Sequence, residues 1–286
     1  MKSNTLFPSF LFIALVAPIS FFGCSQEAEQ PAVEEKAEDA VKEAPPAIAA
    51  DAIKAAAKKV ALVPSPVETQ RALKAAGIET TLASLLKPHP FNLKSKELDF
   101  VAVRTGVILA DLLLTLKSAE KNALINQMNL VQIGMNQLGA GEDIDRTMQD
   151  ILDRTRADSV SRDDLIQEFD ELAGAVIPEL DFNGVSRITP LIQAGSWLEG
   201  ANLVAQAAKG TENPDAVNAL LKQPAVVDYF LEYTQTEGQD KAPAAVTETL
   251  QSSLNTLKAL ADKTEPLTAE DLDSVISVTN DVLSLL

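Results

Sequence analysis

FVAVRTGVILADLLLTL, residues 100–116, is the stretch that decides the fold. In a helix of this sequence apolar side chains lie on nearly every side, which predicts burial by neighbours all round. The segment is too short for a membrane span, and it carries Arg104 and Asp111. A second stretch, ITPLIQAGSWLEGANLVA at 188–205, has the same character. We therefore expect these two helices to pack together at the centre of the protein.

The segments around these two stretches have the period of amphipathic helices. Apolar residues recur at spacings of three and four over 124–138, 165–176 and 272–286. No segment sustains the period of two that is typical of strands. The sequence thus predicts an all-α, multi-helix bundle of about eight to eleven helices over residues 48–286. The expected helices are 49–61, 65–76, 94–117, 119–138, 142–156, 161–177, 187–208, 213–221, 224–235, 243–262 and 268–285.

Two of these helices begin with a hydroxyl residue placed three positions before an acid. Ser161 precedes Asp164, and Thr268 precedes Asp271. A hydroxyl at this position accepts a hydrogen bond from the first turn, and the acid interacts favourably with the helix dipole. The pattern predicts capped helix starts at both places.

Each central helix contains a pair of small residues at a spacing of four, which puts the two on one face of that helix. The pairs are Gly106 with Ala110, and Ser196 with Gly200. A glycine inside a helix costs about 1 kcal/mol relative to alanine. The simplest reason for a glycine inside these helices is that it allows the two helices to approach each other closely. Gly195 follows Gly106 at an offset of 89 residues. This offset leaves open whether the bundle consists of two related halves.

The start of the chain has the pattern of an export signal. Lys2 provides a positive charge, and an apolar run extends over 6–22. This run is shorter than a membrane span and predicts a signal peptide over 1–23. It ends in Phe-Phe-Gly-Cys at 21–24, which resembles the lipobox of bacterial lipoproteins, although Phe21 stands where leucine is usual.

The resemblance implies that Cys24 is acylated and becomes the first residue of the mature protein. Cys24 is the only cysteine of the chain, which agrees with this role. The alternative is an ordinary apolar cysteine at the end of an uncleaved anchor. In a Gram-negative cell, Ser25 in place of aspartate implies sorting to the outer membrane. We therefore expect a lipid-anchored protein of the cell envelope, facing the periplasm.

Residues 24–47 are acidic and contain prolines but no aromatic side chain. Such a segment buries too little apolar surface to offset its ordering entropy, so we expect a flexible tether. The whole chain has a formal net charge of −17. This charge repels nucleic acid and anionic membrane surfaces, so nucleic-acid binding is not expected.

Arg104 and Asp111 are unusual because both lie in the apolar helix. They share a face but stand roughly 10 Å apart along the axis, too far for direct contact. A buried charge needs a partner. One interpretation is a polar binding pocket in which Glu199 of the second central helix faces one of them. The other, which we favour, is an ion pair that sets the helix register.

Aromatic residues offer a second set of candidates for that pocket. Trp197, Tyr229 and Tyr233 are the only residues of their types in the chain. Ligand sites are apolar with a few polar tips, which such side chains can supply. More often they are core residues whose polar atoms reach the surface, and we favour that interpretation.

Catalytic and metal-binding patterns are not visible in the sequence. His89 is the only histidine, in Lys-Pro-His-Pro, and a single histidine in a domain over 48–286 without cysteine does not predict a zinc site. Acidic residues at 142–145 lack the spacing of a calcium loop. We therefore expect no cofactor, no metal and no enzymatic activity.

Together these features favour a non-enzymatic interaction or scaffold protein. It would be held to the membrane through its N-terminal lipid and would contact an envelope protein of unknown identity. The alternative is a periplasmic protein that binds a small molecule between the two central helices. A hydrolase is the least favoured interpretation.

Overall fold

The structure is a computed structural model, which describes residues 63–78, 80–169, 171–172, 188–209, 211, 214–236 and 244–286. All of them belong to the unit Ile48–Leu286. The predicted signal peptide, Cys24, the acidic tether and the predicted helix 49–61 lie outside the described residues. So do the last residues of the predicted helix 161–177.

The described part of the chain is all-α and contains no strand, as the sequence predicts. A 3-10 turn, η1, and a helix over 162–169 and 171–172 complete it. The element bounds are α2 (Pro66–Ala75), η1 (Leu82–Leu85), α3 (Leu98–Thr115), α4 (Lys121–Gln137), α5 (Glu142–Arg156), α7 (Ile188–Ala208), α8 (Pro214–Leu221), α9 (Pro224–Thr236), α10 (Ala244–Ala261) and α11 (Ala269–Leu285).

The predicted cap signals are confirmed at both helix starts. The Ser161 hydroxyl accepts a hydrogen bond from the Asp164 amide at 3.1 Å, and the Thr268 hydroxyl accepts one from Asp271 at 3.2 Å. Asp271 also accepts a hydrogen bond from the Thr268 amide, which completes a capping box.

One predicted helix start is wrong, because α3 begins at Leu98 and not near residue 94. The Asn92 side chain accepts a hydrogen bond from the Lys94 amide, and the Ser95 hydroxyl accepts one from the Glu97 amide. Side chains that bond to nearby amides in this way compete with helix formation. The connection before α3 therefore stays non-helical over 86–97.

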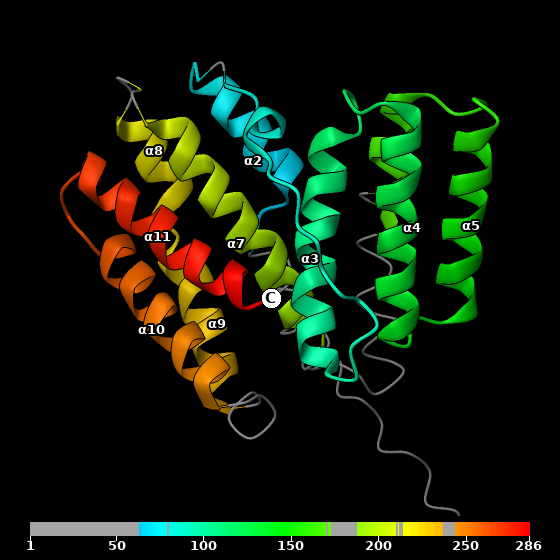
Figure 1. The fold of residues 1–286 in the computed structure, drawn as a ribbon. Coiled ribbons are helices and arrows are strands. Elements are labelled where there is room, and N and C mark those ends of the chain that lie inside the picture. Colours follow the sequence, from blue (N-terminus) through cyan, green and yellow to red (C-terminus); the bar gives the residue numbers. More distant parts are fainter. Residues whose placement is uncertain are drawn as a thin grey trace, which may run out of the picture. The chain divides into compact units, whose positions relative to one another are not determined.

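The two central helices cross with their N-terminal ends at the same end of the bundle (Figure 1). A side chain on Gly106 would overlap the carbonyl oxygen of Ile192, and one on Gly195 would overlap that of Val103. Each glycine thus lets its helix approach the backbone of the other. The expected close approach is confirmed for Gly106. It is wrong for Gly200, which has no atom within 4 Å of an added Cβ.

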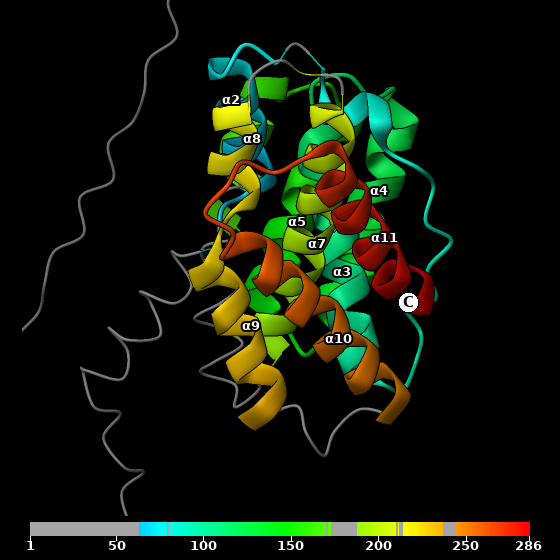
Figure 2. The same cartoon turned by 90° about the vertical axis from the view of Figure 1, so that its left-hand side faces the viewer.

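Two hydrophobic cores flank this crossing. The first joins α3 to α4, α5 and the helix over 162–169 and 171–172, with Met128, Met148 and Phe169 fully buried. The second joins α7 to α2 and to α8–α11, with Leu73 and Phe230 at its centre. Figure 2 shows α9, α10 and α11 as an outer layer on that side. Because α3 and α7 touch both cores, polar side chains between them are removed from water.

Gly106 and Gly195, which are 89 residues apart, make equivalent contacts, each against a carbonyl of the other central helix. The helices that pack around α3 and α7, however, differ. Apart from the crossing itself, α3 packs most extensively against α4, the next helix in the chain, whereas α7 packs most extensively against α11, the last one. The likeness between the halves is therefore confined to the crossing.

Candidate metal centre

Two acidic side chains lie within the central crossing, one on each helix. Asp111 of α3 is 9% exposed and Glu199 of α7 is 3% exposed. α3 and α7 are buried on most sides because their sequences are apolar nearly all round, so both carboxylates are largely removed from bulk water. The sequence left open whether Glu199 would face Arg104 or Asp111, and in the structure it lies beside Asp111.

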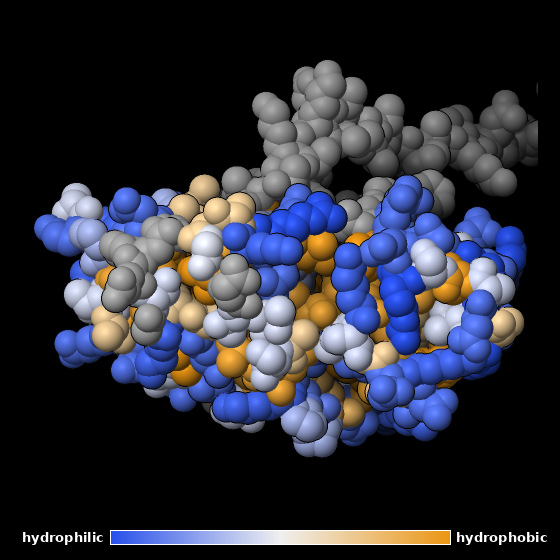
Figure 3. Space-filling model, turned by 90° about the horizontal axis from the view of Figure 1, so that it is seen from above, coloured by the Kyte–Doolittle hydropathy of each residue, from blue (hydrophilic) through white to orange (hydrophobic). Residues whose placement is uncertain are grey.

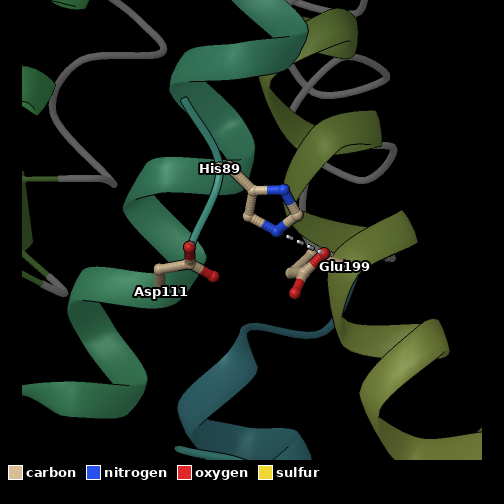
Figure 4. A group of neighbouring side chains, drawn as sticks. All are labelled: His89, Asp111 and Glu199. Atoms are coloured by element: carbon tan, nitrogen blue, oxygen red, sulfur yellow. Dashed lines mark ion pairs between the residues drawn. The ribbon is translucent and has the colours of Figure 1, made fainter. Parts of the chain in front are cut away.

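His89 completes the cluster from the connection that precedes α3. Its Nε2 lies 3.7 Å from Oε2 of Glu199, an ion-pair contact that is too long for a hydrogen bond. The imidazole stacks on Phe91, with ring centroids 5.0 Å apart and an angle of 13° between the planes. Figure 4 shows the three side chains pointing toward one another from the loop, α3 and α7.

Among the residues that the structure describes, each of the three has a buried polar atom that makes no hydrogen bond: Nε2 of His89, Oδ1 of Asp111 and Oε2 of Glu199. A buried polar atom without a partner costs about 1–3 kcal/mol, so three in one place need an explanation. One ligand atom from each residue lies within 4.8 Å of the other two. The unpartnered atoms are thus gathered around one point.

The electrostatics of the cluster show a shortage of positive charge. Burial, and secondly the negative charge of Glu199, raises the pKa of Asp111 to about 8, although His89 acts in the opposite direction. The Glu199 carboxylate raises the pKa of His89 above its ordinary value, against the effect of burial. At neutral pH the ion-free protein therefore holds a proton on Asp111, because a second buried carboxylate charge is unfavourable.

One imidazole nitrogen and two carboxylate oxygens form a ligand set suited to a transition-metal ion. Zinc takes histidine and carboxylate ligands, with bonds of about 2.0–2.2 Å, and catalytic sites with three protein ligands keep one position open. Calcium and magnesium prefer sites made of oxygen alone. The carboxylates stand on rigid helices, so the His89 loop is the element that adjusts to an ion.

Arg104 does not belong to the cluster. Its guanidinium donates to the main-chain oxygens of Leu286 and Asn92, the latter at 2.7 Å, and lies over the Phe100 ring. The pocket predicted from the sequence therefore lacks its arginine. Asn92 follows His89 by three residues, so Arg104 instead holds the loop that carries the histidine.

The aromatic candidates are placed in the cores and away from the acids. Trp197 is 7% exposed, donates to the Gln223 side chain at 3.1 Å and packs on Phe230. Tyr229 also packs on Phe230, while Tyr233 belongs to the first core. These placements match the core interpretation of the three residues.

His89 is the residue that sequence reasoning left out. Its spacing to Asp111 and Glu199 follows no local motif, because the cluster is assembled from a loop and two helices distant in sequence. The available signal was a lone histidine between two prolines, Pro88 and Pro90, shortly before an apolar helix that carries an acid.

No family model, no curated protein and no solved structure matches the chain. The site is therefore interpreted from its own residues. None of the helices in the described ranges combines the length and apolar character of a membrane-spanning helix.

Proposed function

We propose that this chain is a lipid-anchored protein of the cell envelope whose helical domain binds one divalent transition-metal ion through His89, Asp111 and Glu199. The observation that carries the metal site is the convergence, between α3 and α7, of three buried ligand atoms that make no hydrogen bond within the described residues. The proposal departs from the sequence expectation of no metal and keeps the non-enzymatic role expected there.

Charge balance supports an ion of charge two. Two buried carboxylates carry two negative charges when both are ionised, and a neutral imidazole adds none. A divalent ion neutralises this set, replaces the proton on Asp111 and supplies the missing partners of all three atoms. Binding should therefore release protons and become tighter as the pH rises.

The anchor rests on the N-terminal sequence alone. A signal peptide over 1–23 that ends in Phe-Phe-Gly-Cys supports acylation of Cys24, and Ser25 supports the outer membrane. The acidic segment that follows would serve as a tether between the membrane and the metal-binding domain. Labelling with a fatty-acid analogue tests the anchor, because it should be lost in Cys24→Ser. Labelling that survives this change would contradict it.

Titration calorimetry tests the metal site. We would use the full chain carrying Cys24→Ser, so that its only thiol contributes no ligand, and titrate it with Zn²⁺ and Co²⁺. We expect one ion per chain, proton release in buffers of different ionisation heat, and Co²⁺ absorption bands typical of a site with nitrogen and oxygen ligands. Glu199→Gln should weaken binding by about 100-fold or more.

The matched control replaces two exposed acids at the start of α5, Glu142→Gln with Asp143→Asn, which removes two negative charges away from the cluster. Binding should be unchanged in this variant. Circular dichroism checks that each variant is folded. An equal loss in the control, or wild-type affinity in a folded Glu199→Gln chain, would contradict the proposal.

A further inference from the structure

A groove of about 780 Å³ lies at the end of the bundle where α2 and the C-terminal end of α3 meet. We call it the α2 groove. Its volume is in the range of small-molecule sites. The face seen in Figure 3 exposes apolar surface between hydrophilic side chains. The walls of the α2 groove come from α2, the residues around η1, the end of α3 and the helix over 162–169.

The α2 groove has an apolar floor. Val67 of α2, Leu113 and Leu114 of α3 and Ile166 line it, and Ala83 of η1 adds a small side chain. Leu113 is 6% exposed and belongs to the first core, so this floor is part of the rigid interior and does not depend on a loop. Such a surface favours a hydrocarbon chain over a polar ligand.

The rim of the α2 groove is cationic in a chain of net charge −17. Arg71 and Lys74 are exposed, one turn apart on α2, and form no ion pair within the described ranges. Lys117 on the facing side is paired with Asp163 at 2.8 Å, but both are more than 60% exposed, so this pair is weak. Positive charge therefore gathers beside an apolar floor.

We propose that the α2 groove binds an amphiphile with a single acyl chain and an anionic head, such as a fatty acid or a lysophospholipid. The floor would take the hydrocarbon, and Arg71 and Lys74 would take the head. A carboxylate and a phosphate share this chemistry, and the experiment distinguishes them. The groove shares no residue with the metal centre, so each proposal can fail without the other.

A fluorescent fatty acid that brightens in an apolar site provides the assay, below its micellar concentration. The full chain carrying Cys24→Ser is used, so that no acyl chain of its own competes. Palmitate and a lysophosphatidic acid are then added as unlabelled competitors. We expect saturable binding of one probe per chain and displacement by at least one of the two, and the stronger competitor identifies the head group.

Charge reversal on the rim tests the role of the cations. Arg71→Glu with Lys74→Glu should weaken binding about tenfold or more. The matched control, Lys94→Glu with Lys96→Glu, makes the same charge change in the connection before α3, outside the groove. It should leave binding unchanged.

Three outcomes would overturn the proposal. The first is equal displacement by a neutral monoacylglycerol or a cationic alkylammonium, which would indicate general adhesion to apolar surface. The second is an equal loss in the Lys94 and Lys96 control. The third is binding of an acidic helical peptide at the rim without any binding of the amphiphiles.

Discussion

Gly106 and Gly195 occupy matching places on the two central helices, each against a main-chain carbonyl of the other helix: that of Ile192 for Gly106 and that of Val103 for Gly195. The contact allows α3 and α7 to approach more closely than side chains would permit. It also sets how near the two buried acids lie.

We predict that Gly106→Ala destabilises the domain by about 1–3 kcal/mol, because the new methyl group overlaps the Ile192 carbonyl and the helices must separate. Gly200→Ala is the matched control on α7. It has free space around an added Cβ and should be neutral or stabilising by up to about 1 kcal/mol. Urea unfolding measures both values. Equal effects of the two substitutions would show that the crossing is not tightly packed.

The metal-free protein should lose stability as the pH rises from 5 toward 8. Asp111 has a folded pKa of about 8, far above that of the unfolded chain, so the folded state holds a proton that the unfolded state has released. The free energy of unfolding then falls by on the order of 1 kcal/mol per pH unit over this window. The raised pKa of His89 adds to the fall as the pH passes through the folded value.

Asp111→Asn isolates the contribution of the aspartate, because asparagine resembles the protonated acid and does not titrate. Unfolding in urea with a chelator at several pH values should show a flatter pH dependence for this variant. The same slope in both proteins would mean that Asp111 is ionised at neutral pH. Addition of Zn²⁺ should reverse the trend in the wild-type chain, since the bound ion replaces the proton.

Arg104→Met should cost about 1–3 kcal/mol, because both main-chain acceptors lose a charged donor while the apolar stem is kept. Arg146→Met removes an arginine that is 73% exposed and pairs with the exposed Asp143, and it should change stability by less than about 0.5 kcal/mol. Hydrogen exchange should also become faster in the Arg104 variant at the amides of Lys94 and Leu286, which donate to the Asn92 side chain and the Leu283 carbonyl. Unchanged exchange at both would argue against its role in holding the loop.

Thr268→Ala should cost about 1 kcal/mol, because α11 loses the hydroxyl of its capping box. Ser274→Ala on the same helix removes a hydroxyl that bonds only to the Glu270 carbonyl one turn back, so it should be close to neutral. Thermal unfolding of the two variants compares them directly. A larger effect from Ser274 would refute the cap assignment.

Much of the fold could be predicted from the sequence, because helices in a bundle are specified by local periodicity and local stop signals. The apolar stretch 100–116 and the capped start at Thr268 are readable without tertiary information. The start of α3 could not be predicted in this way. Ser95 and Asn92 oppose a helix through hydrogen bonds from nearby amides to their side chains, and these bonds depend on local geometry.

The site could be predicted only in part. Asp111 and Glu199 stand out as charges in apolar helices, and their pairing follows from packing those helices together. Arg104 and Asp111 share a face of α3 but lie two turns apart, so the position of α7 along α3 determines which of them is opposite Glu199, and spacing alone does not give that position. His89 depends on the path of a loop, which no periodic pattern describes.

Because the main chains of α3 and α7 touch, the distance between the two acid-bearing turns is a property of the backbone and does not depend on any flexible side chain. Apolar residues of the two cores can be exchanged for others of similar volume without widening that distance. The loop with His89 has no such constraint. Selectivity among ions should therefore be robust to mutation of the bundle, while the residence time of an ion can be tuned by single changes in one short connection.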